Sequence, residues 1–120
     1  MKVCIPASGE GLDAVMDVRL GRAAKLVFVD TDSGEVESVD NTQNLNAAQG
    51  AGIQTGQQII DGGAEAVVAR NVGPKAYALL SAACVKVYQA DSGTVGQLVE
   101  QLKLGSLKAM GASNVEGHWA

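Results

Sequence analysis

Four cations stand in two loops of this 120-residue chain, where they could bind an anion. Arg19 and Arg22 lie in the first loop, and Arg70 and Lys75 lie in the second. Guanidinium and ammonium groups make strong, charge-assisted hydrogen bonds to anions. Pro74 suits the first position of a helix, and the N–H groups at a helix start also attract anions. The sequence therefore predicts an anion site if the fold brings these loops together.

Two other interpretations of these polar residues remain open. The side chains of Arg19 and Arg22 could instead pair with carboxylates such as Asp13 or Asp17. The spacing GxGxxxG over residues 50–56 suggests a nucleotide site, but it misses the dinucleotide fingerprint, so close helix–sheet packing explains it better. Residues 30–34 read DTDSG, which fits a hairpin turn better than a calcium loop, because the oxygen donors fall at the wrong intervals.

Composition excludes several classes of protein. Hydrophobic residues make up 47% of the chain and only 3% are aromatic, and the net charge of −4 disfavours a nucleic-acid binder. No apolar run is long enough to span a membrane, and Pro6 interrupts any signal peptide, so we expect a cytoplasmic protein. Cys4 and Cys84 are expected to be small buried residues, because disulfides are rare in that compartment.

Alternation and helical spacing predict an α/β domain over residues 1–104 and a tail over residues 105–120. Residues 7–24 read as a long loop. The expected strands cover residues 2–6, 25–31, 35–40, 65–69 and 85–89, and the expected helices cover residues 50–62, 74–83 and 94–104.

This order of elements predicts a five-stranded mixed sheet with the strand order 3-2-1-4-5. The second strand would be antiparallel, and helices would cover both faces, which is the ribonuclease-H-like arrangement. The two cationic loops would then meet at the carboxyl ends of the parallel strands, where open α/β sheets bind ligands. The helices starting at Pro74 and Thr94 would point their free N–H groups at the same edge.

Catalysis is not expected. Ribonuclease chemistry needs carboxylates on the sheet that hold two metal ions, but the first strand offers Cys4, Ile5 and Pro6 instead. A hydrolytic triad would depend on His118, which stands close to the C-terminal end of the sequence.

Four segments together resemble the dinitrogenase iron–molybdenum cofactor biosynthesis family over about the first 104 residues. They are residues 19–23 (RLGRA), 71–76 (NVGPKA), 85–88 (VKVY) and 93–95 (GTV). The resemblance implies a ribonuclease-H-like fold and a protein that carries or helps to assemble a molybdenum-containing metal–sulfur cluster.

One branch of that family has a His-Phe-Gly-Arg segment, where this chain has Arg19 and Leu20 in the first two places. Residues 17–22, 44–54 and 114–119 are instead similar to a branch that carries a mixed molybdenum–copper sulfide cluster. In that branch's motif, Val18 and Leu20 replace Pro and Phe, so the stiffness of the loop is expected to differ.

The resemblance implies a noncovalent carrier of an anionic molybdenum–copper sulfide or related molybdenum–sulfur cluster. The protein would be a monomer that exchanges the cluster with a donor or acceptor protein, with Met16 or Leu20 as an apolar wall and His118 closing over the site. The alternative is a metal-free interaction or regulatory module, suggested by the acidic surface and the tail. The expected cluster contacts are Met16, Arg19, Leu20, Arg22, Asn71, Gly73, Pro74, Lys75 and Thr94.

Overall fold

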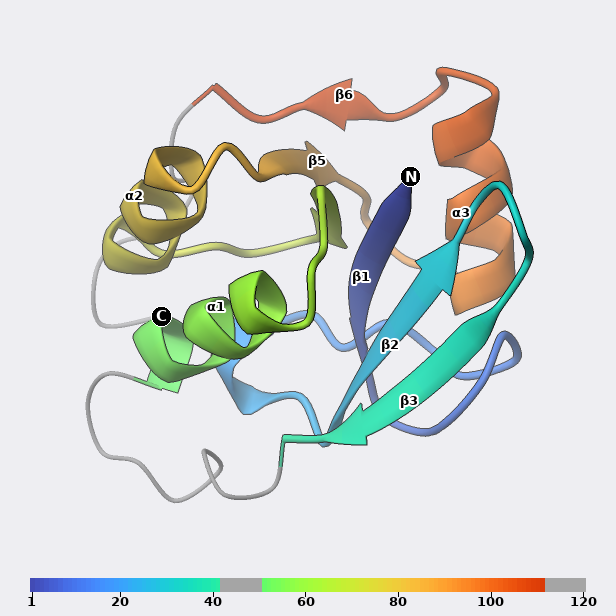
Figure 1. Ribbon diagram of the computed structural model, residues 1–120, viewed down its shortest axis with the longest axis horizontal. Helices are drawn as coiled ribbons and strands as arrows, with labels where there is room; N and C mark the ends of the chain where they lie inside the picture. The colour runs from blue at the N-terminus through green and yellow to red at the C-terminus, as the bar shows by residue number, and fades with distance from the viewer. Residues whose placement is uncertain (42–50, 112–120) are drawn as a thin grey trace.

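A computed structural model describes residues 1–41 and 51–111 (Figure 1). The chain forms a mixed sheet in the order β3-β2-β1-β4-β5-β6. The strands are β1 (Lys2–Ala7), β2 (Lys25–Asp30), β3 (Val36–Asp40), β4 (Ala66–Ala69), β5 (Lys86–Gln89) and β6 (Lys108–Ala109). The helices are the 3-10 turn η1 (Leu20–Arg22), α1 (Ala51–Asp61), α2 (Pro74–Ala82) and α3 (Val95–Lys103).

The predicted order of the first five strands is confirmed, and so is the antiparallel second strand. β2 pairs antiparallel with β1 and β3, whereas β4 runs parallel to β1 and β5. The prediction of only five strands is wrong, because β6 pairs antiparallel with β5 within the part of the chain that was expected to be a tail. A strand of two residues is too short to show alternation, so periodicity could not reveal it.

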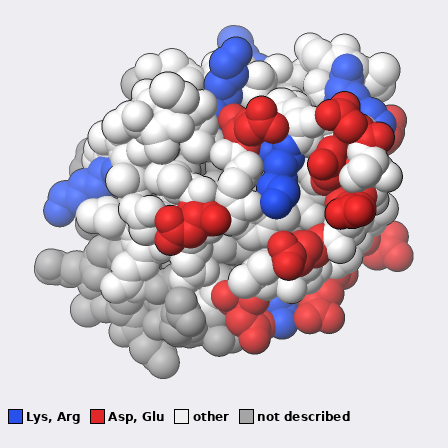
Figure 2. Space-filling view, viewed as in Figure 1, with Lys and Arg blue, Asp and Glu red and all other residues white. Residues whose placement is uncertain are grey.

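The β2–β3 hairpin turns as predicted from its sequence. Asp30 accepts hydrogen bonds from the N–H groups of Asp32 (2.9 Å) and Ser33 (3.3 Å), and Gly34 has a φ of 81°. These bonds to the charged carboxylate lower the pKa of Asp30. Figure 2 shows acidic side chains gathered on the side of the molecule that carries β2, β3 and α3.

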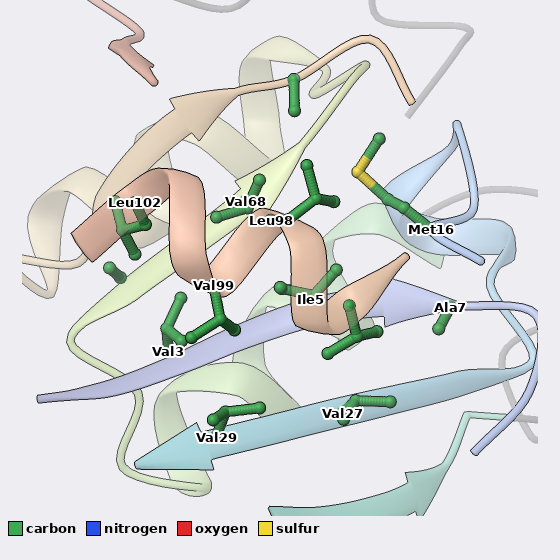
Figure 3. Close-up of a cluster of buried hydrophobic side chains, with 13 residues drawn as sticks. Val3, Ile5, Ala7, Met16, Val27, Val29, Val68, Leu98, Val99 and Leu102 are labelled. Carbon is green, nitrogen blue, oxygen red and sulfur yellow. The ribbon is translucent and has the colours of Figure 1, made fainter. Parts of the chain in front are cut away.

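The two faces of the sheet are covered by different helices. Along β1, Val3, Ile5 and Ala7 face α3 and pack with residues such as Leu98 (Figure 3), whereas Cys4 faces α1 and α2. Successive side chains of β1 therefore point to opposite faces of the sheet. Both faces of β1 are buried because the strand lies in the middle of the sheet.

The two cysteines differ in environment. Cys4 is fully buried, and burial raises the pKa of its thiol, as expected for a core residue. The expectation of burial is wrong for Cys84, which is exposed just after α2 and has a φ of 63°. The left-handed conformation ends the helix, a place that glycine usually takes.

Candidate functional site

The loop between β1 and β2 crosses the carboxyl edge of the sheet and is fixed there by backbone hydrogen bonds. Met16 N–H donates to the Gly93 carbonyl (3.0 Å), and Asp17 N–H donates to the Pro6 carbonyl (2.9 Å). Met16 itself is 4% exposed and packs into the core on the α3 face (Figure 3). The segment that the sequence predicts to be a long loop is thus held against both β1 and the start of α3.

Arg19 lies beside Asn71 at the same edge. The two residues form a parallel bridge, in which Asn71 N–H donates to the Val18 carbonyl at 3.2 Å. Arg19 N–H donates to the Asp17 carboxylate at 3.0 Å, so this carboxylate is used to fix the backbone. The Arg19 side chain is exposed and takes part in none of the ion pairs found between described residues. The two cationic loops therefore do meet, as the topology predicts.

The turn η1 directs the rest of the loop inward. Leu20 is 3% exposed and packs into the core on the α1 and α2 face. Behind it, the Asn41 side-chain amide donates to the Ala23 carbonyl (3.0 Å) and exchanges hydrogen bonds with the Thr55 hydroxyl. Asn41 and Thr55 are both fully buried. This polar pair ties the end of the loop to α1, and a sequence reading does not reveal it because the contact joins distant segments.

The start of α2 lies at this edge and has no side-chain cap among the described residues. Its N-cap is Gly73, with no side-chain cap, and Pro74 occupies the first helical position. The first hydrogen bond within the helix runs from Tyr77 N–H to the Gly73 carbonyl (2.9 Å). The N–H groups of Lys75 and Ala76 precede that bond, in the turn where the partial positive charge of the helix is concentrated.

The start of α3 is closed by internal hydrogen bonds. Thr94 and Gln97 form a capping box, in which each side chain accepts the other's backbone N–H. Val95 N–H donates to the Ala14 carbonyl (2.9 Å), and Gly96 N–H donates to the Leu12 carbonyl (2.8 Å). Of the two helix starts expected to hold an anion, the start of α2 is therefore the one for which no cap is found among the described residues.

The remaining predicted residues differ in exposure: the cationic-loop residues reach the surface, whereas the two apolar ones are buried. Lys75, Pro74 and Arg70 are exposed and Arg22 is half-buried, whereas His118 lies outside the described residues. Met16 and Leu20, expected to form an apolar wall, are core side chains with little free surface. The exposed apolar side chains of this loop are Leu12 (44% exposed), Val15 (55% exposed) and Val18 (40% exposed). Val15 and Val18 stand close to Arg19 in the sequence, and this proximity is the sequence signal that could have identified them as site residues.

The glycine-rich start of α1 serves close packing. A Cβ atom on Gly56 would lie 3.3 Å from Leu79 Cδ2, so the buried glycine lets α1 approach α2. The packing expected from the GxGxxxG spacing is thus between helices, not between a helix and the sheet; Gly50 lies outside the described residues.

Within residues 1–41 and 51–111, no three His, Cys, Asp or Glu side chains are grouped so as to hold a metal ion. In the same ranges, no helix is long and apolar enough to cross a membrane.

The fold and this edge define a small α/β protein whose β1–β2 loop lies over the ends of β1 and β4, beside an uncapped helix start. The family described as "Dinitrogenase iron-molybdenum cofactor" matches residues 1–105, and the chain belongs to that family. The family expectation from the sequence is thereby confirmed.

Solved structures support the same assignment. The apo form of the orange protein from Desulfovibrio gigas is 37% identical, with a TM-score of 0.92 over 95% of this chain and 96% of that one. A Thermotoga protein of the DUF35 family, described as NifB-like, is 35% identical, with a TM-score of 0.83 over 97% and 98% of the two chains. An uncharacterized protein of Methanocaldococcus jannaschii is 27% identical over 110 residues, which is 90% of each chain.

Proposed function

We propose that this protein is a noncovalent carrier of an anionic molybdenum–copper sulfide cluster or a related molybdenum–sulfur cluster, bound at the carboxyl edge of the sheet. The family and the similarity to the orange protein support a role in carrying or assembling a metal cluster. The observation that carries the proposal is the pairing of Arg19 with Asn71, beside the uncapped start of α2.

The chemistry of the site suits such a cargo. A sulfide-rich cluster brings its own sulfur ligands, so the protein has to supply positive charge and N–H donors. The Arg19 side chain would compensate the charge of the cluster, and the Asn71 amide and the N–H groups at Lys75 and Ala76 would donate hydrogen bonds to its sulfur atoms. Arg22, Arg70 and the Lys75 ammonium group would add positive charge around the same edge.

Several predicted residues would act indirectly. Gly73 and Pro74 set the open start of α2, while Thr94 closes α3 and thereby holds the loop. Met16 and Leu20 anchor the two ends of the Arg19 segment in opposite cores. Val15 and Val18 would provide the apolar contact surface. His118 is proposed to close over the cluster.

We further propose that the chain acts as a cytoplasmic monomer that receives the cluster from, or passes it to, another protein. Residues 1–104 would form the cluster-binding domain, with residues 105–120 as a C-terminal tail that adds β6 to its sheet. The fold would be ribonuclease-H-like, but Cys4, Ile5 and Pro6 stand on β1 where that class of nuclease needs acids, so no enzymatic reaction is proposed.

Reconstitution tests the proposal directly. The apo-protein is incubated with tetrathiomolybdate, with and without copper, and metal eluting with the protein on gel filtration is measured. Retained molybdenum is expected, and a larger amount with copper would favour the mixed cluster. If no molybdenum is retained under either condition, the proposal fails.

A further inference from the structure

The outer edge of the sheet at β3 carries features that a cluster carrier does not need. β3 pairs with β2 on one side, and on its other side no strand pairs with it among the described residues. Val36 is 37% exposed and Val39 is 38% exposed, on opposite faces of the strand. Exposed sheet edges are templates for pairing with another extended chain.

The register shows which backbone groups are available on that edge. Asp30 N–H donates to the Glu35 carbonyl at one end of the hairpin, and Asn41 N–H donates to the Ala24 carbonyl at the other. Between these two ends, every second residue of β3 belongs to a pair that is hydrogen-bonded to β2. Within β3, Glu37 and Val39 therefore bond to β2. The N–H and C=O groups of the other three residues point away from the sheet; these residues are Val36, Ser38 and Asp40.

Acidic side chains flank this edge. Glu35 and Glu37 are exposed, lie on the same face two residues apart, and take part in none of the ion pairs between described residues. Asp40 already pairs with Lys25. A hollow of about 310 Å³ opens at the start of β3 on the α1 face, lined by Lys2, Phe28, Asp30, Glu35, Val36 and Glu37. The ammonium group of Lys2 is used there by the Gly62 carbonyl, at 3.0 Å.

A second copy of this chain does not suit the edge. Antiparallel pairing of two β3 strands would bring Glu35 and Glu37 of both copies to one face of the joined sheet. Like charges at neighbouring positions of a sheet repel each other. The charge of the edge instead complements a strand with lysine or arginine at alternate positions.

We propose that β3 is a docking edge for an extended basic segment of a partner protein. The segment adds a strand to the sheet by bonding to the outward groups of Val36, Ser38 and Asp40. Two of its cationic side chains, two residues apart in its sequence, lie against Glu35 and Glu37, with one reaching the hollow beside Phe28. This site needs no metal and is separate from the proposed cluster site.

Amide hydrogen exchange, followed by NMR on the metal-free protein, tests this proposal. The probe is a short synthetic peptide that alternates lysine and valine, and the control is the same peptide with glutamate in place of lysine. The lysine peptide is expected to slow exchange at Val36, Ser38 and Asp40 while leaving Glu37 and Val39, which already bond to β2, unchanged. The glutamate peptide is expected to have no effect.

Two variants separate charge from strand pairing. The double change Glu35→Gln and Glu37→Gln should weaken peptide binding roughly fivefold, because two exposed ion pairs are lost. Val36→Pro removes one outward N–H without removing a bond to β2, and should weaken binding roughly tenfold, whereas Val36→Thr should not. The proposal would be overturned if both peptides slowed amide exchange equally, or if neither slowed it. It would also be overturned if exchange slowed with rising protein concentration in the absence of peptide.

Discussion

Arg19 and Asn71 lie side by side in a parallel bridge, although they belong to loops that follow different strands. The bridge joins the β1–β2 loop to the residues that follow β4, and in it Asn71 N–H donates to the Val18 carbonyl. The bond is between backbone groups, so the backbone at both residues is positioned before any ligand binds. A site arranged in advance loses less conformational entropy on binding.

The approach of α1 to the sheet depends on Gly62. A Cβ atom at this position would lie 2.6 Å from the buried Phe28 ring. Gly62→Ala should therefore lower the free energy of unfolding by about 1–3 kcal/mol, measured by urea denaturation. Gly111 has no atom within 4 Å of such a Cβ, so Gly111→Ala is the matched control and should leave stability unchanged. Equal stability of both variants would contradict this packing.

The Asn41–Thr55 pair should stabilise the fold as a unit. Asn41→Ala leaves the Ala23 carbonyl and the Thr55 hydroxyl without that buried partner, so we expect a loss of about 1–3 kcal/mol in the free energy of unfolding. In a double-mutant cycle, Thr55→Val should cost less when Asn41 is already replaced. Strictly additive losses would show that the two side chains do not act together.

The two cysteine thiols should differ in their reactivity toward iodoacetamide, because they differ in accessibility. Iodoacetamide needs an accessible thiolate, and Cys4 is buried with a raised pKa, whereas Cys84 is exposed. Intact mass should show one modification of the native protein and two in denaturant. Cys84→Ser should abolish the native modification. Native labelling that persists in this variant would mean that β1 opens readily.

The low pKa of Asp30 predicts a pH-dependent contribution to stability. A carboxyl with a lowered pKa in the folded state stabilises the protein above its ordinary value of 3.8, and this contribution is lost as the pH falls through the folded-state pKa. Asp30→Ala should therefore destabilise the protein near neutral pH, and the difference from wild type should shrink in acid. The exposed Asp91, changed to Ala, should show no such trend. A difference that grows toward acid would contradict the turn geometry.

Local patterns predicted most of this fold, because each main element carries its own signal. Residues 26–29 form a continuous apolar run, and Pro74 marks a helix start. The patterns failed where a long-range contact decides the outcome. Leu20 and Met16 are apolar residues in a loop, and only the packed structure shows that they face two cores. Likewise, the Leu12 and Ala14 carbonyls close the start of α3, which no spacing within α3 could reveal.

Loss of the Arg19 charge is the most direct test of the proposed carrier. Arg19→Gln and Lys103→Gln each remove one positive charge, but Lys103 lies in the last turn of α3, at the opposite end of that helix from Thr94, and pairs with Glu100. Both variants are loaded with tetrathiomolybdate and copper, and the affinity for molybdenum is measured. We predict roughly tenfold weaker binding for Arg19→Gln, because a charge-assisted bond is lost, and wild-type binding for Lys103→Gln. Equal binding by the two variants would contradict the account.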